Sequence, residues 1–266
     1  MDPAEPKKDP GRLLKTAVVQ PLYTRPLSEP AVKQIAFVVY PGLTLLDLAG
    51  PLQVFSVLAE TCEASGASCR FEVTTVGKVT DPVDTDAPLR VAAEKTFAEV
   101  PHPFALFIPG GTVPTLRALA DQALIEYVRS AAQRAQIIGS ICTGALILAA
   151  AGLLNGRRAT THWGFHRVLE RLGATYVPER WVEDERFITA AGISAGIDMA
   201  LHVAQRLTDE QVARQVQLIL EYDPQPPLGG IDWSQVDRNA MDPVVADMIR
   251  KAFAEHPELA AKLLDL

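Results

Sequence analysis

A short apolar strand that passes directly into an alanine-rich helix constrains this chain more than any other feature. Residues 136–141 contain three isoleucines, which is typical of a buried strand. Residues 143–151 are packed with Ala and Leu and are followed by Gly152, which predicts a helix that ends at a glycine. Because almost no residues are left for a connection, the strand and the helix must meet in a tight turn, and Cys142 occupies that turn.

The residues on both sides of Cys142 are small. Ser140 and Gly144 lie two positions before and after it, which gives the small-x-nucleophile-x-small pattern of a nucleophile elbow. At the N-terminus of a helix, unpaired N–H groups and the helix dipole favour a thiolate, so we predict that Cys142 is a nucleophile. The alternative is that Cys142 only fills the core, because most free cysteines behave as small hydrophobic side chains.

Length and composition indicate one large globular domain with tails. The chain has 266 residues, of which 48% are hydrophobic and 21% are charged, and its net charge is −7. The negative charge argues against nucleic acid or an anionic membrane surface as a partner. The three cysteines form no disulfide framework and no CxxC pair, so we expect a reduced, cytoplasmic protein. We identify no signal peptide and no segment long enough to span a membrane.

Strand and helix signals alternate along the chain. Strands are predicted at 34–40, 69–76, 105–108, 136–141, 176–182 and 187–190, and helices at 43–58, 116–135, 143–151, 163–172, 194–207 and 209–222. A kink is expected at Gly50-Pro51 in the first helix. The alternation predicts an α/β fold with a mainly parallel sheet and helices on both faces. Sites in such sheets form at the carboxyl ends of the strands, so the loops after Tyr40 and Ile108 should meet the cysteine turn.

Three regions follow from the composition. Residues 1–33 contain six prolines among charged residues, which predicts a mobile N-terminal arm. Residues 34–225 carry the alternating pattern and form the predicted catalytic domain. Residues 226–266 begin as a Pro- and Gly-rich linker and end in a predicted helix near 244–264, which we expect to pack on the domain or on a dimer partner.

Asp47 is the predicted proton partner of Cys142. It is an acidic residue in an otherwise apolar run, between Leu46 and Leu48. Burial raises the pKa of a carboxyl group, so such an aspartate can carry a proton near neutral pH. The alternative is an exposed or helix-capping aspartate.

Backbone amides near the cysteine are candidates for stabilising charge. Gly110 and Gly111 follow a predicted strand, and their N–H groups, with the amide of Thr143, are predicted to form an anion-stabilising hole. The alternative is that the glycine pair only makes a turn. The Thr143 hydroxyl can donate to the thiolate, orient a water or cap the following helix.

A metal site is not expected. His162 and His166 have helical i,i+4 spacing, but no acidic or cysteine ligand accompanies them in the HExxH arrangement. We therefore predict no metal and no cofactor. His162 is expected to be a structural residue next to the site, and a base for Cys142 is the alternative. Trp181, Ile193 and the arm before residue 34 are candidates for the wall of a substrate pocket.

Together these motifs resemble a known family. The Pro-Gly-Gly111 loop, the Ser-Ile-Cys142-Thr-Gly-Ala elbow, the Gly-Arg-Arg-Ala-Thr-Thr-His162-Trp stretch and the segment Gly192-Ile-Ser-Ala-Gly-Ile-Asp-Met199 are similar to those of the ThiJ/PfpI superfamily of class I glutamine amidotransferase-like proteins. The resemblance covers roughly residues 34–225 and implies a flavodoxin-like sandwich that is usually a homodimer. It is strongest toward isocyanide hydratases and the amidase-like domains of AraC-type regulators.

The resemblance implies a chemistry and a set of catalytic residues. Isocyanide hydratases combine a cysteine, an aspartate in a Leu-Asp-Leu-x-Gly-Pro motif and a threonine after the cysteine, which match Cys142, Asp47 and Thr143 here. The implied reaction adds water to an isocyanide, a small electrophile, and gives an N-substituted formamide through a thioimidate on the cysteine. In this comparison His162 and Gly192 lie in the shell around the site.

Differences between this sequence and other branches of the family argue against some functions. Peptidases and glyoxalases that resemble PfpI have His directly after the cysteine, where this chain has Thr143, and glyoxalase-like members usually have Glu at the position of Asp47. A regulator needs a C-terminal DNA-binding module, and the residues after 222 are neither long nor basic enough for one. Two alternatives to a hydratase stay open: a ligand- or oxidation-sensing module without enzymatic activity, and a related glyoxalase or hydrolase.

Overall fold

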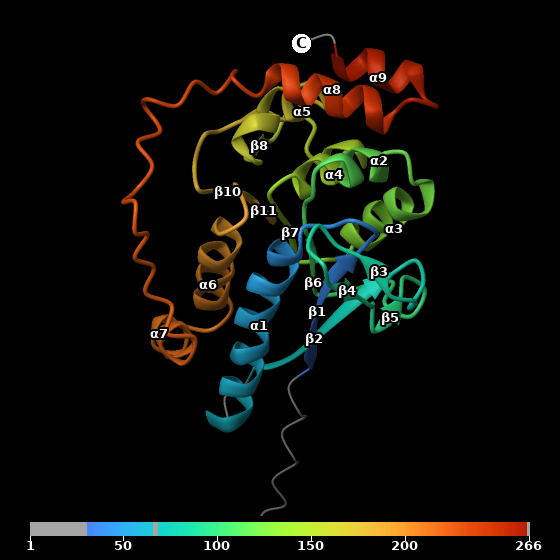
Figure 1. Cartoon of the computed structure of the whole chain (residues 1–266). Coiled ribbons are helices and arrows are strands. Elements are labelled where there is room, and N and C mark those ends of the chain that lie inside the picture. The colour runs from blue at the N-terminus through green and yellow to red at the C-terminus, as the bar shows by residue number, and fades with distance from the viewer. Residues whose placement is uncertain (1–30, 66–68, 265–266) are drawn as a thin grey trace, which may run out of the picture.

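A seven-stranded sheet in the order β10-β11-β7-β6-β1-β2-β5 forms the centre of the fold (Figure 1). The computed structural model describes residues 31–65 and 69–264. Neighbouring strands are parallel throughout, except that β10 runs antiparallel to β11. The predicted α/β fold with a mainly parallel sheet is therefore confirmed.

The strands of the central sheet are β1 (Val32–Val39), β2 (Arg70–Gly77), β5 (Lys95–Thr96), β6 (Ala105–Ile108), β7 (Ile137–Ile141), β10 (Trp181–Asp184) and β11 (Phe187–Ala190). Two small ribbons pair β3 (Val83–Asp84) with β4 (Arg90–Val91) and β8 (Arg158–Ala159) with β9 (Thr175–Tyr176). The helices are α1 (Leu45–Ser65), α2 (Val113–Ala118), α3 (Gln122–Ala132), α4 (Gly144–Ala150), α5 (His166–Arg171), α6 (Ala195–Leu207), α7 (Glu210–Ile219), α8 (Asp242–Ala252) and α9 (Pro257–Leu264), with one 3₁₀ turn at Trp163–Phe165.

Helices cover both faces of the sheet. Helices α1, α6 and α7 pack together on one face, and α2, α3 and α4 lie on the other, as Figure 1 shows. Strands β6 and β7 and residues 35–39 of β1 are buried between these layers, which explains their largely apolar sequences. Phe37 and Phe107 stack in the core with ring centroids 5.3 Å apart, and Phe55 of α1 packs on both.

Three predicted helices have different boundaries in the structure. The first helix continues through Pro51 to Ser65, so no turn interrupts it at Gly50-Pro51. The helix predicted at 116–135 is divided into α2 and α3, because the Asp121 carboxylate accepts hydrogen bonds from the N–H groups of residues 123 and 124 and so caps a new helix. The predicted C-terminal helix is also divided, and its second part begins at Pro257, a residue suited to the first helical turn.

The length of α1 contradicts the expectation that no segment is long enough to span a membrane. Its 21 residues and mean hydropathy of 1.2 are enough, by length and composition alone, to cross a membrane. Its buried side chains instead pack against the sheet and against α6 and α7, as in the core helix of a globular domain.

The C-terminal segment returns to the domain. Residues 220–241, which we call the connector, contain no helix or strand and run along the outside from α7 to α8 (Figure 1). Helix α8 then packs on α2, and its residues Val245 and Ile249 are buried. The N-terminal arm up to residue 30 lies outside the described residues, so the pocket role predicted for it has no structural counterpart here.

Candidate active site

The candidate site lies at the carboxyl ends of four adjacent strands. Strands β11, β7, β6 and β1 are neighbours and parallel, so the residues that follow them lie along one edge of the sheet. Cys142 follows β7, Gly110 and Gly111 lie just beyond β6, and Tyr40 follows β1. Asp47 joins them from the first turn of α1.

Cys142 has the strained backbone that a nucleophile elbow requires. Its φ is +55°, in the left-handed region that non-glycine residues rarely adopt. Its N–H donates to the carbonyls of Ala190 (3.1 Å) and Ala191 (2.9 Å), and its carbonyl accepts from the Thr161 hydroxyl at 3.0 Å. The turn also needs the small neighbour at 144, because a Cβ there would lie 2.1 Å from the carbonyl oxygen of Ile108.

Asp47 is fully buried beside the cysteine. Its Oδ2 accepts a hydrogen bond from the N–H of Gly110 at 3.0 Å, whereas Oδ1 makes no well-formed hydrogen bond with any described residue. The Cys142 thiol lies close enough for each group to shift the pKa of the other. The structure thus brings the two side chains together, and their catalytic pairing stays a prediction.

Gly110 lies where the site residues converge. A Cβ on it would be 2.6 Å from the Thr143 amide nitrogen, 2.7 Å from the Thr143 hydroxyl and 2.9 Å from Asp47 Oδ2. Any side chain at this position would separate Asp47 from the cysteine turn. Glycine is thus required here for close approach rather than for an unusual backbone angle.

The two glycines do not form an open anion hole as predicted. The Gly110 N–H is occupied by Asp47, and the Gly111 N–H donates to the Thr143 hydroxyl at 2.9 Å. That hydroxyl in turn donates to the Gly111 carbonyl at 2.5 Å and does not cap α4. The glycine loop therefore positions Asp47 and Thr143, and the Thr143 hydroxyl both accepts from and donates to Gly111 of the loop.

Two further polar residues in this network were missed in the sequence. The Thr115 hydroxyl lies 3.3 Å from that of Thr143 and 2.8 Å from that of Tyr40, and the Tyr40 hydroxyl donates to the Pro109 carbonyl at 2.9 Å. Both residues are buried, and burial raises the pKa of Tyr40 well above its ordinary value. The position of Tyr40 at a strand end before Pro41-Gly42 was the available signal.

Burial controls the protonation of the Cys142–Asp47 pair. Loss of solvation raises the pKa of Asp47 to about 7, against an ordinary value of 3.8. Burial and the Asp47 charge also raise the pKa of Cys142 above its ordinary value, while the N–H and hydroxyl of Thr143 lower it less. The N-terminus of α4 does favour the thiolate through the Thr143 N–H, but burial and the Asp47 charge outweigh it. Near neutral pH the thiol therefore keeps its proton, whereas Asp47 titrates.

An apolar pocket of about 680 Å³ adjoins the cysteine turn. Its wall includes Leu46, next to Asp47, together with Thr161 and Ala191, which hydrogen-bond the backbone of Cys142. Other lining residues, from the body of the domain and from the connector, include Trp163, Tyr176, Ile193, Ile231, Trp233 and Arg238. Cys142 and Asp47 are themselves buried and do not line the pocket, which reaches the site through their neighbours.

The two predicted neighbours of the site also line this pocket. Gly192 lies against the ring of His162, since a Cβ on it would be 3.2 Å from His162 Cδ2. Burial lowers the pKa of His162, and its Nδ1 accepts a hydrogen bond from the N–H of Gly164 at 3.2 Å. A neutral imidazole that shapes the pocket wall fits this geometry better than a base for the thiol.

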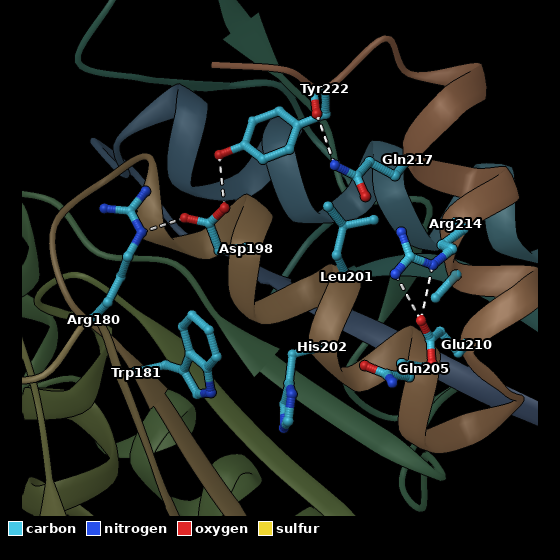
Figure 2. Close-up of a pocket in the computed structure, with 11 residues that line it drawn as sticks. Arg180, Trp181, Asp198, Leu201, His202, Gln205, Glu210, Arg214, Gln217 and Tyr222 are labelled. Carbon is cyan, nitrogen blue, oxygen red and sulfur yellow. Dashed lines mark hydrogen bonds and ion pairs between the residues drawn. The ribbon is translucent and has the colours of Figure 1, made fainter. Parts of the chain in front are cut away.

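Trp181, a candidate for the pocket wall, lies in a different hollow. Figure 2 shows it beside His202 and Leu201, in a second pocket between α6, α7 and the β10 edge. The ring centroids of Trp181 and His202 are 5.4 Å apart. Within residues 31–65 and 69–264, no three His, Cys, Asp or Glu side chains are grouped as a metal site would need.

Comparison with known proteins gives a family and a similar enzyme. The model of the DJ-1/PfpI family matches residues 33–206. An isonitrile hydratase from Pseudomonas putida is 40% identical over 195 residues, which are 73% of this chain and 80% of that protein. The HTH-type transcriptional regulator CdhR from Pseudomonas aeruginosa is 38% identical over 117 residues, but these are 42% of this chain and 33% of the regulator.

Solved structures agree with this assignment. A ThiJ/PfpI family protein from Pseudomonas syringae has a TM-score of 0.73 and 34% identity, and the match covers 90% of this chain and 93% of that one. Drosophila melanogaster DJ-1beta, at 20% identity and a TM-score of 0.59, covers 73% of this chain and 100% of its own, and it supports the fold alone.

Proposed function

Because this chain belongs to the DJ-1/PfpI family, we propose that it uses the Cys142–Asp47 pair to add water to an isocyanide. The product of this reaction is an N-substituted formamide. The observation that carries the proposal is the buried Cys142 thiol beside the buried Asp47 carboxyl, with an apolar pocket lined by their neighbours Leu46, Thr161 and Ala191. The 40% identity to an isonitrile hydratase supports the same chemistry.

The first step forms a covalent bond to sulfur. The sulfur of Cys142 attacks the terminal carbon of the isocyanide, the thiol proton passes to Asp47, and Asp47 delivers a proton to the same carbon. The result is a thioimidate, R–N=CH–S–Cys142, and no atom is lost. A carboxyl with a pKa of about 7 suits this transfer, because it both accepts and donates a proton near neutral pH.

The second step consumes water. A water molecule adds to the thioimidate carbon and its proton reaches the nitrogen, which gives R–NH–CH(OH)–S–Cys142. Cleavage of the C–S bond then releases the formamide R–NH–CHO and restores the thiol. The Thr143 N–H stabilises the sulfur as charge develops on it, and the Thr143 hydroxyl keeps the glycine loop in place.

An oxidation sensor is the weaker alternative. Cys142 is 5% exposed and its pKa is raised by burial, whereas readily oxidised sensor cysteines are exposed and acidic. The same features suit a nucleophile that loses its proton to a neighbouring carboxyl only when the substrate is bound.

We also propose that the protein is a cytoplasmic homodimer. The three cysteines are free thiols in the structure, which fits a reducing compartment, and the dimer follows from the family resemblance. Light scattering after size exclusion tests the dimer, and cell fractionation tests the location.

Turnover of an aryl isocyanide tests the activity. The native chain is expected to produce the formamide, and Cys142→Ala is expected to lose this activity. An intact-mass measurement during turnover should show an adduct equal to the substrate mass in the native chain. Formamide production that survives in Cys142→Ala would refute the covalent mechanism.

A conservative control separates chemistry from folding. Cys62→Ala removes another buried thiol, one far from the site in sequence, at the end of α1. This variant should keep full activity. If it loses activity as completely as Cys142→Ala does, the loss reports damage to the fold and the proposal gains no support.

A further inference from the structure

Of the two positively charged side chains that line the apolar pocket, one has a carboxylate partner and the other has none among the described residues. Two arginines, Arg180 and Arg238, line it. Arg180 forms an ion pair with Asp198, which also accepts a hydrogen bond from Tyr222 (Figure 2). Arg238 has no carboxylate within ion-pair distance among residues 31–65 and 69–264. The unmatched positive charge of the pocket is therefore at Arg238.

Aromatic side chains hold Arg238 in a defined position. Its Nη1 donates to the Tyr176 hydroxyl at 3.1 Å, and its guanidinium lies 5.5 Å from the ring centre of Trp233. The side chain is half-buried, although the residues around it in the connector are mostly exposed. A guanidinium has five N–H donors, and the hydrogen bond to Tyr176 uses one of those of Arg238, which lines the pocket.

The remaining ionisable groups on the wall do not remove this charge. The pKa of His162 is lowered by burial, so the ring is neutral at neutral pH. Glu179 is exposed and forms no ion pair with either arginine. The apolar and aromatic surface around Arg238, from Trp163, Tyr176 and Trp233, fits a flat ring.

We propose that Arg238 is a specificity-determining residue that binds the carboxylate of an aromatic substrate. The substrate class is then an aryl isocyanide with its carboxylate at the end opposite the isocyanide carbon. A planar carboxylate matches the fork of a guanidinium and makes two parallel hydrogen bonds to it. With its carboxylate on Arg238, the ring lies along the aromatic wall and the isocyanide points toward Cys142. The orientation rests on the proposed function, but recognition of the carboxylate does not.

Binding of formamides, the product class of the proposed reaction, tests the inference without any turnover. Calorimetry at low salt compares 4-formamidobenzoate with neutral 4-methylformanilide, which has a methyl group in place of the carboxylate. The native chain should bind the carboxylate about tenfold more tightly, the size expected of a partly exposed charged hydrogen bond. Arg238→Gln should remove this preference and leave the affinity for 4-methylformanilide unchanged, and Arg238→Lys should restore part of it.

A matched control and two contrary results complete the test. Arg214→Gln makes the same change of charge on α7, where Arg214 pairs with Glu210 outside this pocket, and should leave both affinities unchanged. Equal binding of the two ligands by the native chain would overturn the inference. So would an equal loss of both in Arg238→Gln, because Arg238 would then only support the wall. Selective binding without isocyanide turnover would reject the proposed function and retain the carboxylate site.

Discussion

Replacing Asp47 with asparagine should stabilise the fold while it removes activity. The two side chains have nearly the same shape, but asparagine carries no charge. Folding raises the pKa of Asp47 from 3.8 to about 7, because burial penalises the carboxylate. At about 1.4 kcal/mol per pKa unit, ionisation of Asp47 costs the folded state about 4 kcal/mol above pH 7. The variant avoids this cost.

The sign of the effect depends on pH. A carboxyl group with a raised folded-state pKa binds its proton more tightly in the folded chain, so protonation favours folding. This favourable contribution is complete below pH 3.8 and is lost as the pH rises through about 7. Relative to Asp47→Asn, the native chain should therefore lose about 4 kcal/mol of unfolding free energy between about pH 4 and about pH 8.

Urea unfolding and kinetics on the same samples check the prediction. Unfolding free energies of the two chains are measured at intervals across this pH range, with the exposed-site variant Asp81→Asn as a control. Formamide production by Asp47→Asn should fall by about 10²- to 10⁴-fold, the usual contribution of a general acid–base. A difference in unfolding free energy that stays constant with pH would refute the raised pKa and, with it, the role of Asp47 as proton carrier.

Three other changes test separate parts of the structure. Gly110→Ala places a methyl group 2.6 Å from the Thr143 amide; it should cost about 1–3 kcal/mol in thermal unfolding and most of the activity, and native kcat/KM would contradict the contact. The sulfurs of Cys62 and Cys69 lie 3.0 Å apart, so diamide should join them with loss of two hydrogens, and a peptide map that pairs Cys142 instead would refute this. Ile249→Ala should cost about 2–5 kcal/mol in urea unfolding if α8 is docked, and a loss below about 1 kcal/mol would show that it is not.

The parts of the fold predicted well depend on local patterns. Strands such as β6 and β7 are short apolar runs that end at Pro, Gly or the cysteine turn, so their positions were predictable from residue type. The break between α2 and α3 was missed because Asp121 acts as a cap through its side-chain hydrogen bonds, and no glycine or proline marks the site. At Pro51 a turn was expected that the structure does not have, since α1 runs through this proline to Ser65.

The proximity of the candidate site residues was predictable, but their electrostatics were not. Asp47 and Cys142 were identified from an acidic residue in an apolar run and from the small residues around a strand end. The raised pKa of Cys142 depends on how many atoms surround the sulfur in three dimensions, which a linear pattern does not contain. The occupation of the Gly110 and Gly111 amides depends likewise on side chains brought from distant segments.

Under the proposed function, the connector would choose the substrate while the family domain performs the chemistry. Residues 33–206 match the family model and contain the cysteine, the aspartate and the loops that hold them, whereas Ile231, Trp233 and Arg238 belong to a segment after that match. Residues 220–241 contain no helix or strand, and Ile231 and Trp233 are exposed. Randomising the pocket-facing positions of the connector is therefore a route to new substrate ranges from an unchanged reaction centre.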